Sequence, residues 1–133
     1  MNEKKTVLVA EDADAMRSVI CFGLVRTGFD VTSARDGSEA WQLVSHGSFD
    51  LLITDYQMPG MTGGELSERI RNDARLSDLP IILLTAKVYE LDTAGMIESL
   101  SLNRVMAKPY SPRELRQVAE ECLATRLSCG PCA

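Results

Sequence analysis

The sequence has no cluster of basic residues, few aromatic residues and no long apolar run. Its 14 Lys and Arg residues are outnumbered by 19 Asp and Glu residues, and the formal net charge is -5. A nucleic-acid surface needs grouped cations to neutralise phosphates, and a membrane-spanning helix needs about 20 apolar residues in a row. The polar start, residues 1–5, lacks the apolar core of a signal peptide. We therefore expect no nucleic-acid or membrane partner, and a cytoplasmic protein.

Histidine is scarce as well, and there are four cysteines. His46 is the only histidine and stands at the end of a predicted helix, where the helix dipole favours a cation, so we expect a capping role rather than catalysis. Cys21 and Cys122 fall in helical patterns, while Cys129 and Cys132 form a C-x-x-C pair in the last residues. We expect all four cysteines to be reduced. A redox motif needs a strand-to-helix setting that lowers the thiol pKa, so we expect the terminal pair to belong to a simple tail.

With 133 residues, 45% of them hydrophobic and 25% charged, the chain has the size and composition of one globular domain. No internal repeat, low-complexity tract or linker interrupts it. We expect one domain over residues 1–128, a short C-terminal tail over residues 129–133, and no second domain.

Apolar runs and helical patterns alternate along the chain. The runs predict strands at residues 6–10, 29–34, 49–55, 79–86 and 104–107, and helical spacing follows at 14–27, 36–45, 62–71, 88–100 and from 111 onward. This alternation predicts right-handed crossovers and a parallel sheet covered on both faces. The helices entered at residues 36, 62 and 111 carry capping signals, an Asp, Thr or Ser followed three residues later by Glu. The charged stretch at residues 67–75 is interpreted as a solvated helix face.

Polar residues stand at the carboxyl ends of the predicted strands. Glu11 and Asp12 follow the first strand, Asp55 ends the third, Thr85 closes the fourth and Lys108 follows the fifth. These ends share one edge of an open parallel sheet, and ligands bind there, where the strand order reverses. We predict an α/β, flavodoxin-like (βα)5 three-layer sandwich with sheet order 2-1-3-4-5. In that order the first and third strands are adjacent, so the three carboxylates become neighbours.

Three neighbouring carboxylates repel one another unless a cation offsets their charge. Oxygen ligands of this kind suit Mg²⁺, which keeps several waters and leaves positions for a phosphate. The Thr85 hydroxyl and the Lys108 ammonium complete a pocket for an anion, so Asp55 is placed to attack phosphorus and form an aspartyl phosphate. The turn at residues 58–60 brings the loop backbone toward the ion, whereas Gly63 and Gly64 are interpreted as simple helix-entry residues.

At these residues the chain resembles the receiver domain of bacterial two-component response regulators, over essentially its whole length. The resemblance rests on the acidic pair Glu11 and Asp12, on DYQMPGMTG starting at Asp55, on LLTA ending at Ala86, and on AKPY with Lys108. It implies that Asp55 accepts a phosphoryl group from a phosphohistidine of a sensor histidine kinase or histidine phosphotransfer protein. Such a protein catalyses only its own phosphorylation and dephosphorylation, and signals to a downstream protein by conformational change.

The resemblance also implies a role for each residue of the pocket. Asp12, Asp55 and the backbone carbonyl of Gln57 would ligate Mg²⁺, with Glu11 acting directly or through water. Three groups would bind the phosphoryl oxygens: the Thr85 hydroxyl, the Ala86 amide and Lys108.

Two positions depart from the family pattern. Glu11 stands where Asp is usual, which changes reach more than charge. Val105, three residues before Lys108, replaces the Tyr or Phe that swings inward as Thr85 moves on phosphorylation. We therefore expect the phosphorylation chemistry to be kept and its readout to differ from the aromatic switch.

Two other classes of protein fit part of the pattern. A Mg²⁺-dependent phosphohydrolase of the haloacid dehalogenase type also has an apolar strand followed by D-x-D, with Asp12 as nucleophile. The chain is short for that fold, and no acidic pair follows the fourth strand to hold its metal. A receiver-like interaction module that is never phosphorylated is the other alternative, and the complete set of site residues argues against it.

Overall fold

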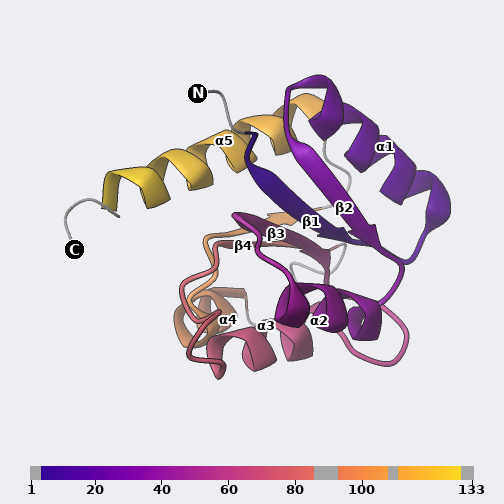
Figure 1. Cartoon of the computed structure of the whole chain (residues 1–133). Helices are drawn as coiled ribbons and strands as arrows, with labels where there is room; N and C mark the ends of the chain where they lie inside the picture. Colours follow the sequence, from indigo (N-terminus) through magenta and orange to yellow (C-terminus); the bar gives the residue numbers. More distant parts are fainter. Residues whose placement is uncertain (1–3, 86–92, 108–110, 130–133) are drawn as a thin grey trace.

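The computed structural model of the chain describes residues 4–85, 93–107 and 111–129 (Figure 1). Strand and helix alternate, and all neighbouring strands pair in parallel. The sheet has the order β2-β1-β3-β4-β5, which confirms the predicted flavodoxin-like topology. The strands are β1 (Thr6–Ala10), β2 (Asp30–Ala34), β3 (Leu51–Asp55), β4 (Ile81–Thr85) and β5 (Arg104–Ala107); the helices are α1 (Asp14–Arg26), α2 (Gly37–His46), α3 (Gly63–Arg71), α4 (Thr93–Leu100) and α5 (Pro112–Cys129).

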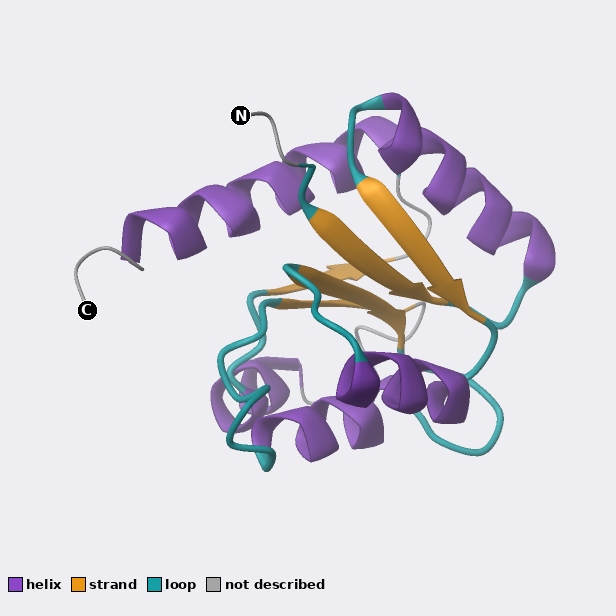
Figure 2. Cartoon of the chain, in the orientation of Figure 1, coloured by secondary structure: helices purple, strands orange, loops and turns teal. Residues whose placement is uncertain are grey.

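Helices cover both faces of the sheet, with α1 and α5 on one side and α2, α3 and α4 on the other (Figure 1 and Figure 2). Alternate strand residues enter two separate cores: Val7 and Val9 pack on the side of α1 and α5, and Leu8 and Ala10 on the opposite side. Every residue of the central strands β3 and β4 is buried. Because both faces of these strands are covered, their sequences show no polar side.

The pairing register brings the carboxyl ends of β1 and β3 level with each other. Ala10, the last residue of β1, pairs with Thr54, and Asp55 pairs with Leu84 of β4. Glu11 therefore follows β1 at the height of Asp55, as the sequence predicts. Thr85 ends β4 at the same edge of the sheet.

The three predicted capping signals are confirmed. In each case the side chain of the first residue accepts a hydrogen bond from the backbone N–H of the Glu three positions later. At α3 the bond is reciprocal, because the Glu65 carboxylate also accepts from the Thr62 N–H at 3.0 Å. These side chains satisfy N–H groups that have no partner within a helix and so define where α2, α3 and α5 begin.

Strand and helix bounds differ from the sequence prediction at a few ends. β3 begins at Leu51 rather than residue 49, because the Asp50 carboxylate accepts the Thr6 N–H at 2.8 Å in place of a backbone carbonyl. The described part of the fourth helix begins at Thr93, and the expected residues 88–92 lie outside the described residues. α5 continues to Cys129, and residues 130–133 of the expected tail, with Cys132, also lie outside them.

The interpretation of residues 67–75 as a solvated face is wrong for Arg71, which is half-buried, whereas Arg75 is exposed but binds neighbouring carbonyl groups. The Arg71 guanidinium donates to the carbonyl groups of residues 77, 100 and 101, and thereby ties α3 to the end of α4. Arg75 donates to the carbonyls of residues 44, 45 and 47 at the end of α2. Burial lowers the pKa of Arg71 from its ordinary value, and the Asp78 carboxylate opposes that effect. Carbonyls at helix ends have no intrahelical partner, so they attract these long cationic side chains.

Within the described ranges, no helix combines the length and apolarity that crossing a membrane requires.

Candidate functional site

Three carboxylates meet at the edge of the sheet where the strand order reverses. Glu11, Asp12 and Asp55 each offer one oxygen, and these oxygens all lie within 4.8 Å of one another. Asp55 is 5% exposed and Glu11 is 1% exposed, whereas Asp12 is open to solvent. In the described part of the chain this is the only such group of three or more metal-ligating side chains. The sequence prediction that these three residues are neighbours is confirmed.

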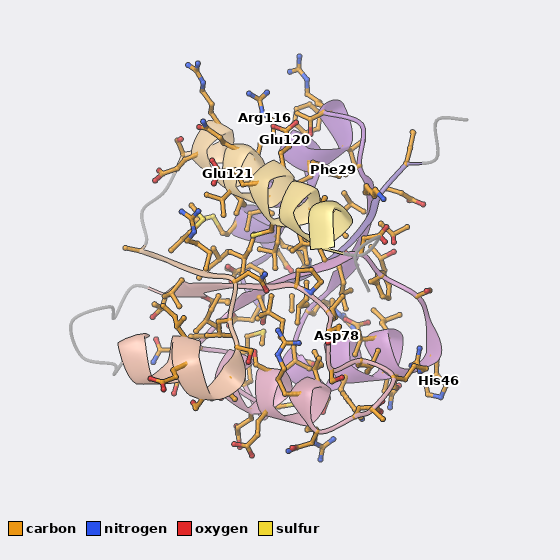
Figure 3. All side chains as sticks on the ribbon, turned by 90° about the vertical axis from the view of Figure 1, so that its left-hand side faces the viewer. Phe29, His46, Asp78, Arg116, Glu120 and Glu121 are labelled. Carbon is orange, nitrogen blue, oxygen red and sulfur yellow. The ribbon has the colours of Figure 1, made fainter. Side chains whose placement is uncertain are left out.

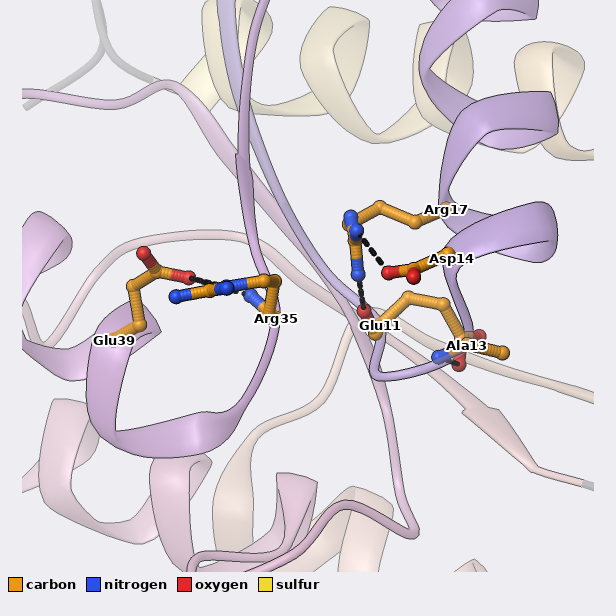
Figure 4. A network of polar contacts seen from close by, with 6 residues as sticks. All are labelled: Glu11, Ala13, Asp14, Arg17, Arg35 and Glu39. Carbon is orange, nitrogen blue, oxygen red and sulfur yellow. Dashed lines mark hydrogen bonds and ion pairs between the residues drawn. The ribbon is translucent and has the colours of Figure 1, made fainter.

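Glu11 is held by its surroundings through backbone and side chain (Figure 4). Its N–H donates to the Ala34 carbonyl at 3.1 Å, and its carboxylate accepts the Ala13 N–H at 3.2 Å. Arg17 donates to the Glu11 carbonyl at 3.0 Å and also forms an ion pair with Asp14. Arg17 is a supporting residue that was not predicted from the sequence, where its only signal is the spacing of three residues from Asp14.

The loop after β3 is anchored at both ends. The Tyr56 N–H donates to the Leu84 carbonyl at 2.8 Å, and the Tyr56 carbonyl accepts the Gly63 N–H at 2.7 Å. Between them Gly60 adopts a positive φ of 80°, a conformation that residues with a Cβ rarely adopt. Met58 is buried in the core beside α2 and α3. The loop is therefore a fixed part of the edge that carries Asp55.

Gly63 has a tighter role than the helix-entry function expected for it. A Cβ at this position would lie 2.3 Å from the backbone oxygen of Asp55 and 2.9 Å from Leu83 Cδ1. At the start of α2, a Cβ on Gly37 would likewise lie 2.4 Å from the Met61 oxygen. Both glycines allow helices to approach the strand end and its loop closely, which a sequence pattern does not reveal.

A hollow of about 310 Å³ opens beside the carboxylates. It is lined by Asp12 together with residues of the loop after β3: Tyr56, Gln57, Met58, Pro59 and Thr62. Gln57 is exposed, and Asp12 contributes one wall, so the hollow connects the carboxylates with solvent. Access from solvent is a condition for exchange of a small ion or a phosphoryl donor.

The structure describes some of the remaining predicted residues and not others. Thr85 is 1% exposed and ends the strand next to β3, at the same edge as the carboxylates. Ala86 and Lys108 lie outside the described residues. Val105 pairs with Leu83 and packs, partly buried, against the core on the side of α2, α3 and α4. His46 is exposed in the last turn of α2, where its Nδ1 lies 2.8 Å from the Gln42 carbonyl oxygen.

The carboxylates have the chemistry of a site for a hard cation. Mg²⁺ prefers oxygen ligands and binds through one or a few carboxylates while keeping water. A cation at this position would offset the repulsion among three acids whose oxygens are within 4.8 Å of one another. The residues present therefore fit a magnesium ion.

Fold and acid cluster together define the class of protein: a flavodoxin-like domain with acidic residues at the reversal point of its sheet. The response regulator receiver domain family matches residues 7–120. The chain belongs to this family, and it is a CheY-like receiver domain of two-component signalling. Members of this class are signalling proteins rather than classical enzymes.

Individual relatives agree with this assignment. Chemotaxis protein CheY1 of Helicobacter pylori is 34% identical over 121 residues, which cover 90% of this chain and 97% of that protein. Chemotaxis protein CheY of Pseudomonas aeruginosa is 34% identical over 116 residues, covering 86% of this chain and 93% of that protein. Among solved structures, chemotaxis response regulator CheY4 of Vibrio cholerae superimposes with a TM-score of 0.83 at 26% identity, covering 90% and 99% of the two chains.

The haloacid dehalogenase alternative is not supported. The family match, the relatives and the strand order all belong to receiver domains. In this fold Asp12 stands one residue beyond the strand-flanking Glu11, at the rim of the site, whereas Asp55 ends the central strand β3.

Proposed function

We propose that Asp55 is the phosphoacceptor of this receiver domain. The observation that carries the proposal is the convergence of Glu11, Asp12 and Asp55, with Asp55 at the end of a buried central strand. Asp55 is almost fully buried but lies in the same group as the exposed Asp12, which faces the hollow. A carboxylate in this setting combines a fixed position with access for a reactant.

The reaction is a transfer of a phosphoryl group from nitrogen to oxygen. One Asp55 carboxylate oxygen forms a bond to phosphorus while the bond from phosphorus to the donor imidazole nitrogen breaks, and that nitrogen keeps the electron pair. Glu11, Asp12, Asp55 and the Gln57 carbonyl would hold Mg²⁺, which when bound offsets negative charge on the carboxylates and phosphoryl oxygens. The remaining catalytic groups bind the phosphoryl oxygens: the Thr85 hydroxyl, the Ala86 amide and the Lys108 ammonium. Hydrolysis of the aspartyl phosphate at the same residues returns the resting state.

The donor in this proposal is a phosphohistidine on a sensor histidine kinase or a histidine phosphotransfer protein, and the output is a contact with a downstream protein. The matched relatives named chemotaxis proteins are covered over almost their whole length by this chain, which supports signalling through protein contact. Phosphorylation shifts the balance between two conformations, since a ligand that binds both equally changes neither.

The readout in this proposal differs from a swing of an aromatic side chain. Val105 occupies the position of that aromatic residue on β5 and packs against the core beneath α4. As a valine it has neither the volume nor the hydroxyl of the usual residue. When Thr85 at the end of β4 moves, no aromatic side chain at position 105 of β5 can move with it.

Phosphorylation by acetyl phosphate tests the assignment of Asp55. With Mg²⁺ present, intact-mass spectrometry should detect one added phosphoryl group, and hydroxylamine should remove it because it is an acyl phosphate. Asp55→Asn should abolish the added mass while the circular dichroism spectrum stays unchanged. Asp30→Asn is the matched control, since it removes the same charge from the start of β2, at the opposite end of the sheet. Undiminished labelling of Asp55→Asn would refute the assignment. A native protein that binds neither Mg²⁺ nor beryllofluoride would instead support the never-phosphorylated interaction module.

A further inference from the structure

A second hollow, of about 460 Å³, lies between the end of α1 and the first turns of α5. We call it the arginine hollow, because Arg26, Arg113 and Arg116 line it together with Gly23 and Thr27. None of these lining residues carries a negative charge, although the chain as a whole has a net charge of -5. A lining whose charged residues are all basic is therefore not a consequence of the overall composition.

Arg116 has a hydrogen-bonding group without a partner. Its side chain is half-buried, and its Nε is buried and donates to no acceptor among the described residues. Figure 3 shows Arg116 where α5 meets α1, with Glu120 one turn further along α5. In the described part of the chain, Glu120 forms no ion pair with it. A buried donor of this kind destabilises the protein unless an acceptor reaches it, and more so when the group is charged.

The positions of Arg113 and Arg116 are also unfavourable with respect to the dipole of their helix. They are the second and fifth residues of α5, an 18-residue helix whose N-terminus carries partial positive charge and favours anions. Arg26 is different, since it stands in the last turn of α1, where a cation is favoured, and its guanidinium lies 5.6 Å from the centroid of the Phe22 ring. Helix electrostatics therefore account for Arg26 but for neither arginine of α5.

We propose that the arginine hollow binds the phosphate group of a small molecule. Guanidinium groups bind phosphate through paired hydrogen bonds. Three of them carry more positive charge than a single carboxylate would balance, which favours a phosphate group as the anion. The positive end of α5 adds to the attraction. The volume exceeds that of phosphate alone and falls in the range of about 300–1,000 Å³ that small-molecule sites occupy. An organic phosphate of the size of a mononucleotide is therefore the expected ligand.

The arginine hollow shares no lining residue with the hollow beside the carboxylates, so binding there and phosphorylation at Asp55 can be tested separately. The 133-residue chain labelled with ¹⁵N is titrated in EDTA, which keeps divalent cations from the carboxylates of the acid cluster. The probes are inorganic phosphate and AMP, at an ionic strength held constant with chloride. We expect saturable shifts of the amide signals of Gly23, Thr27 and Arg113, and none at Gln57 in the loop after β3.

Substitutions identify the groups responsible. Arg116→Gln and Arg113→Gln should each weaken binding about tenfold or more, because each removes a charged hydrogen-bond donor. Arg69→Gln is the matched control, since it removes an exposed arginine from α3 on the other side of the sheet and should leave the affinity unchanged. If the half-buried Arg116 variant fails to fold, the exposed Arg113 variant decides the matter.

Two results would overturn the proposal: shifts that do not saturate and match those caused by chloride, or an affinity that Arg113→Gln leaves intact. Tighter binding of AMP than of inorganic phosphate supports an organic phosphate as the ligand. Equal affinities support free phosphate as the source of the same chemistry.

Discussion

Replacing Asp12 by Asn tests the electrostatic basis of the acid cluster. Its carboxylate oxygen lies within 4.8 Å of oxygens of Glu11 and Asp55. At that separation two like charges repel by about 0.9 kcal/mol in a medium with the dielectric constant of water, and salt screening leaves roughly half. Asp12 is exposed but Glu11 and Asp55 are buried, so the water-like value is a lower bound, and the two pairs together amount to at least about 1 kcal/mol of repulsion.

Removing the Asp12 charge relieves this repulsion, but a second effect opposes the gain in stability. Asp12 precedes α1, whose N-terminus favours a nearby anion by about 0.3–1 kcal/mol. No capping hydrogen bond is lost in the variant, because the N-cap is Ala13 and has no side-chain bond. The repulsion is at least as large as the opposing effect, so without metal we expect the free energy of unfolding of Asp12→Asn to equal or exceed the native value.

Magnesium should stabilise the native protein more than the variant. Binding only to the folded state raises the free energy of unfolding by about 1.4 kcal/mol at ten times the dissociation constant. Asp12→Asn should lose most of this gain, because it lacks one of the proposed metal ligands. Urea unfolding followed by circular dichroism, in EDTA and in Mg²⁺, measures both quantities. The control Asp30→Asn should keep the full gain.

One combination of results would refute the reasoning on Asp12. That combination is a loss of unfolding free energy well above about 1 kcal/mol in EDTA together with an unchanged gain from Mg²⁺. About 1 kcal/mol is the largest loss expected from the helix N-terminus. Asp12 would then stabilise the fold directly and would not bind the ion.

Two further predictions concern the packing around the site and the core beneath α5. Gly63→Ala places a Cβ 2.3 Å from the Asp55 oxygen, so urea unfolding should show a loss of about 1–3 kcal/mol, against little change for the exposed Glu68→Ala on the same helix; native stability would contradict the contact. Burial raises the pKa of the Cys122 thiol above its ordinary value of 9.0, so the fold favours the neutral thiol. This stability is complete below the pKa of the unfolded chain and is lost as pH rises through the higher folded pKa, so Cys122→Ala should flatten the fall in stability at alkaline pH, and an unchanged slope would argue against it.

Local patterns in the sequence were sufficient for much of this fold. The alternation of apolar runs and helical stretches predicted the parallel sheet, and the caps before α2, α3 and α5 predicted where those helices begin. Both kinds of signal act over a few residues, since strand burial and helix capping depend on near neighbours in the chain. Glu11, Asp12 and Asp55 were predicted to meet because parallel strands present their carboxyl ends at one edge.

Contacts between distant segments could not be predicted in this way. The sequence around Arg71 and Arg75 predicts a solvated face, yet these side chains bind carbonyl groups up to 30 and 31 residues away in the chain. Gly63 is an ordinary helix-entry residue in the sequence, yet the space it leaves is filled by the backbone of Asp55. Such roles depend on the separation of elements after packing, for which sequence spacing holds no signal.

The sequence by itself determined the class of fold and the identities of the carboxylates, because periodicity and strand ends are local properties of the chain. Only the tertiary structure decided that their oxygens come within 4.8 Å of one another, and that arginines from α1 and α5 line one hollow. The physical reason is that charge interactions depend on distance through space, and the packing of helices on the sheet determines that distance.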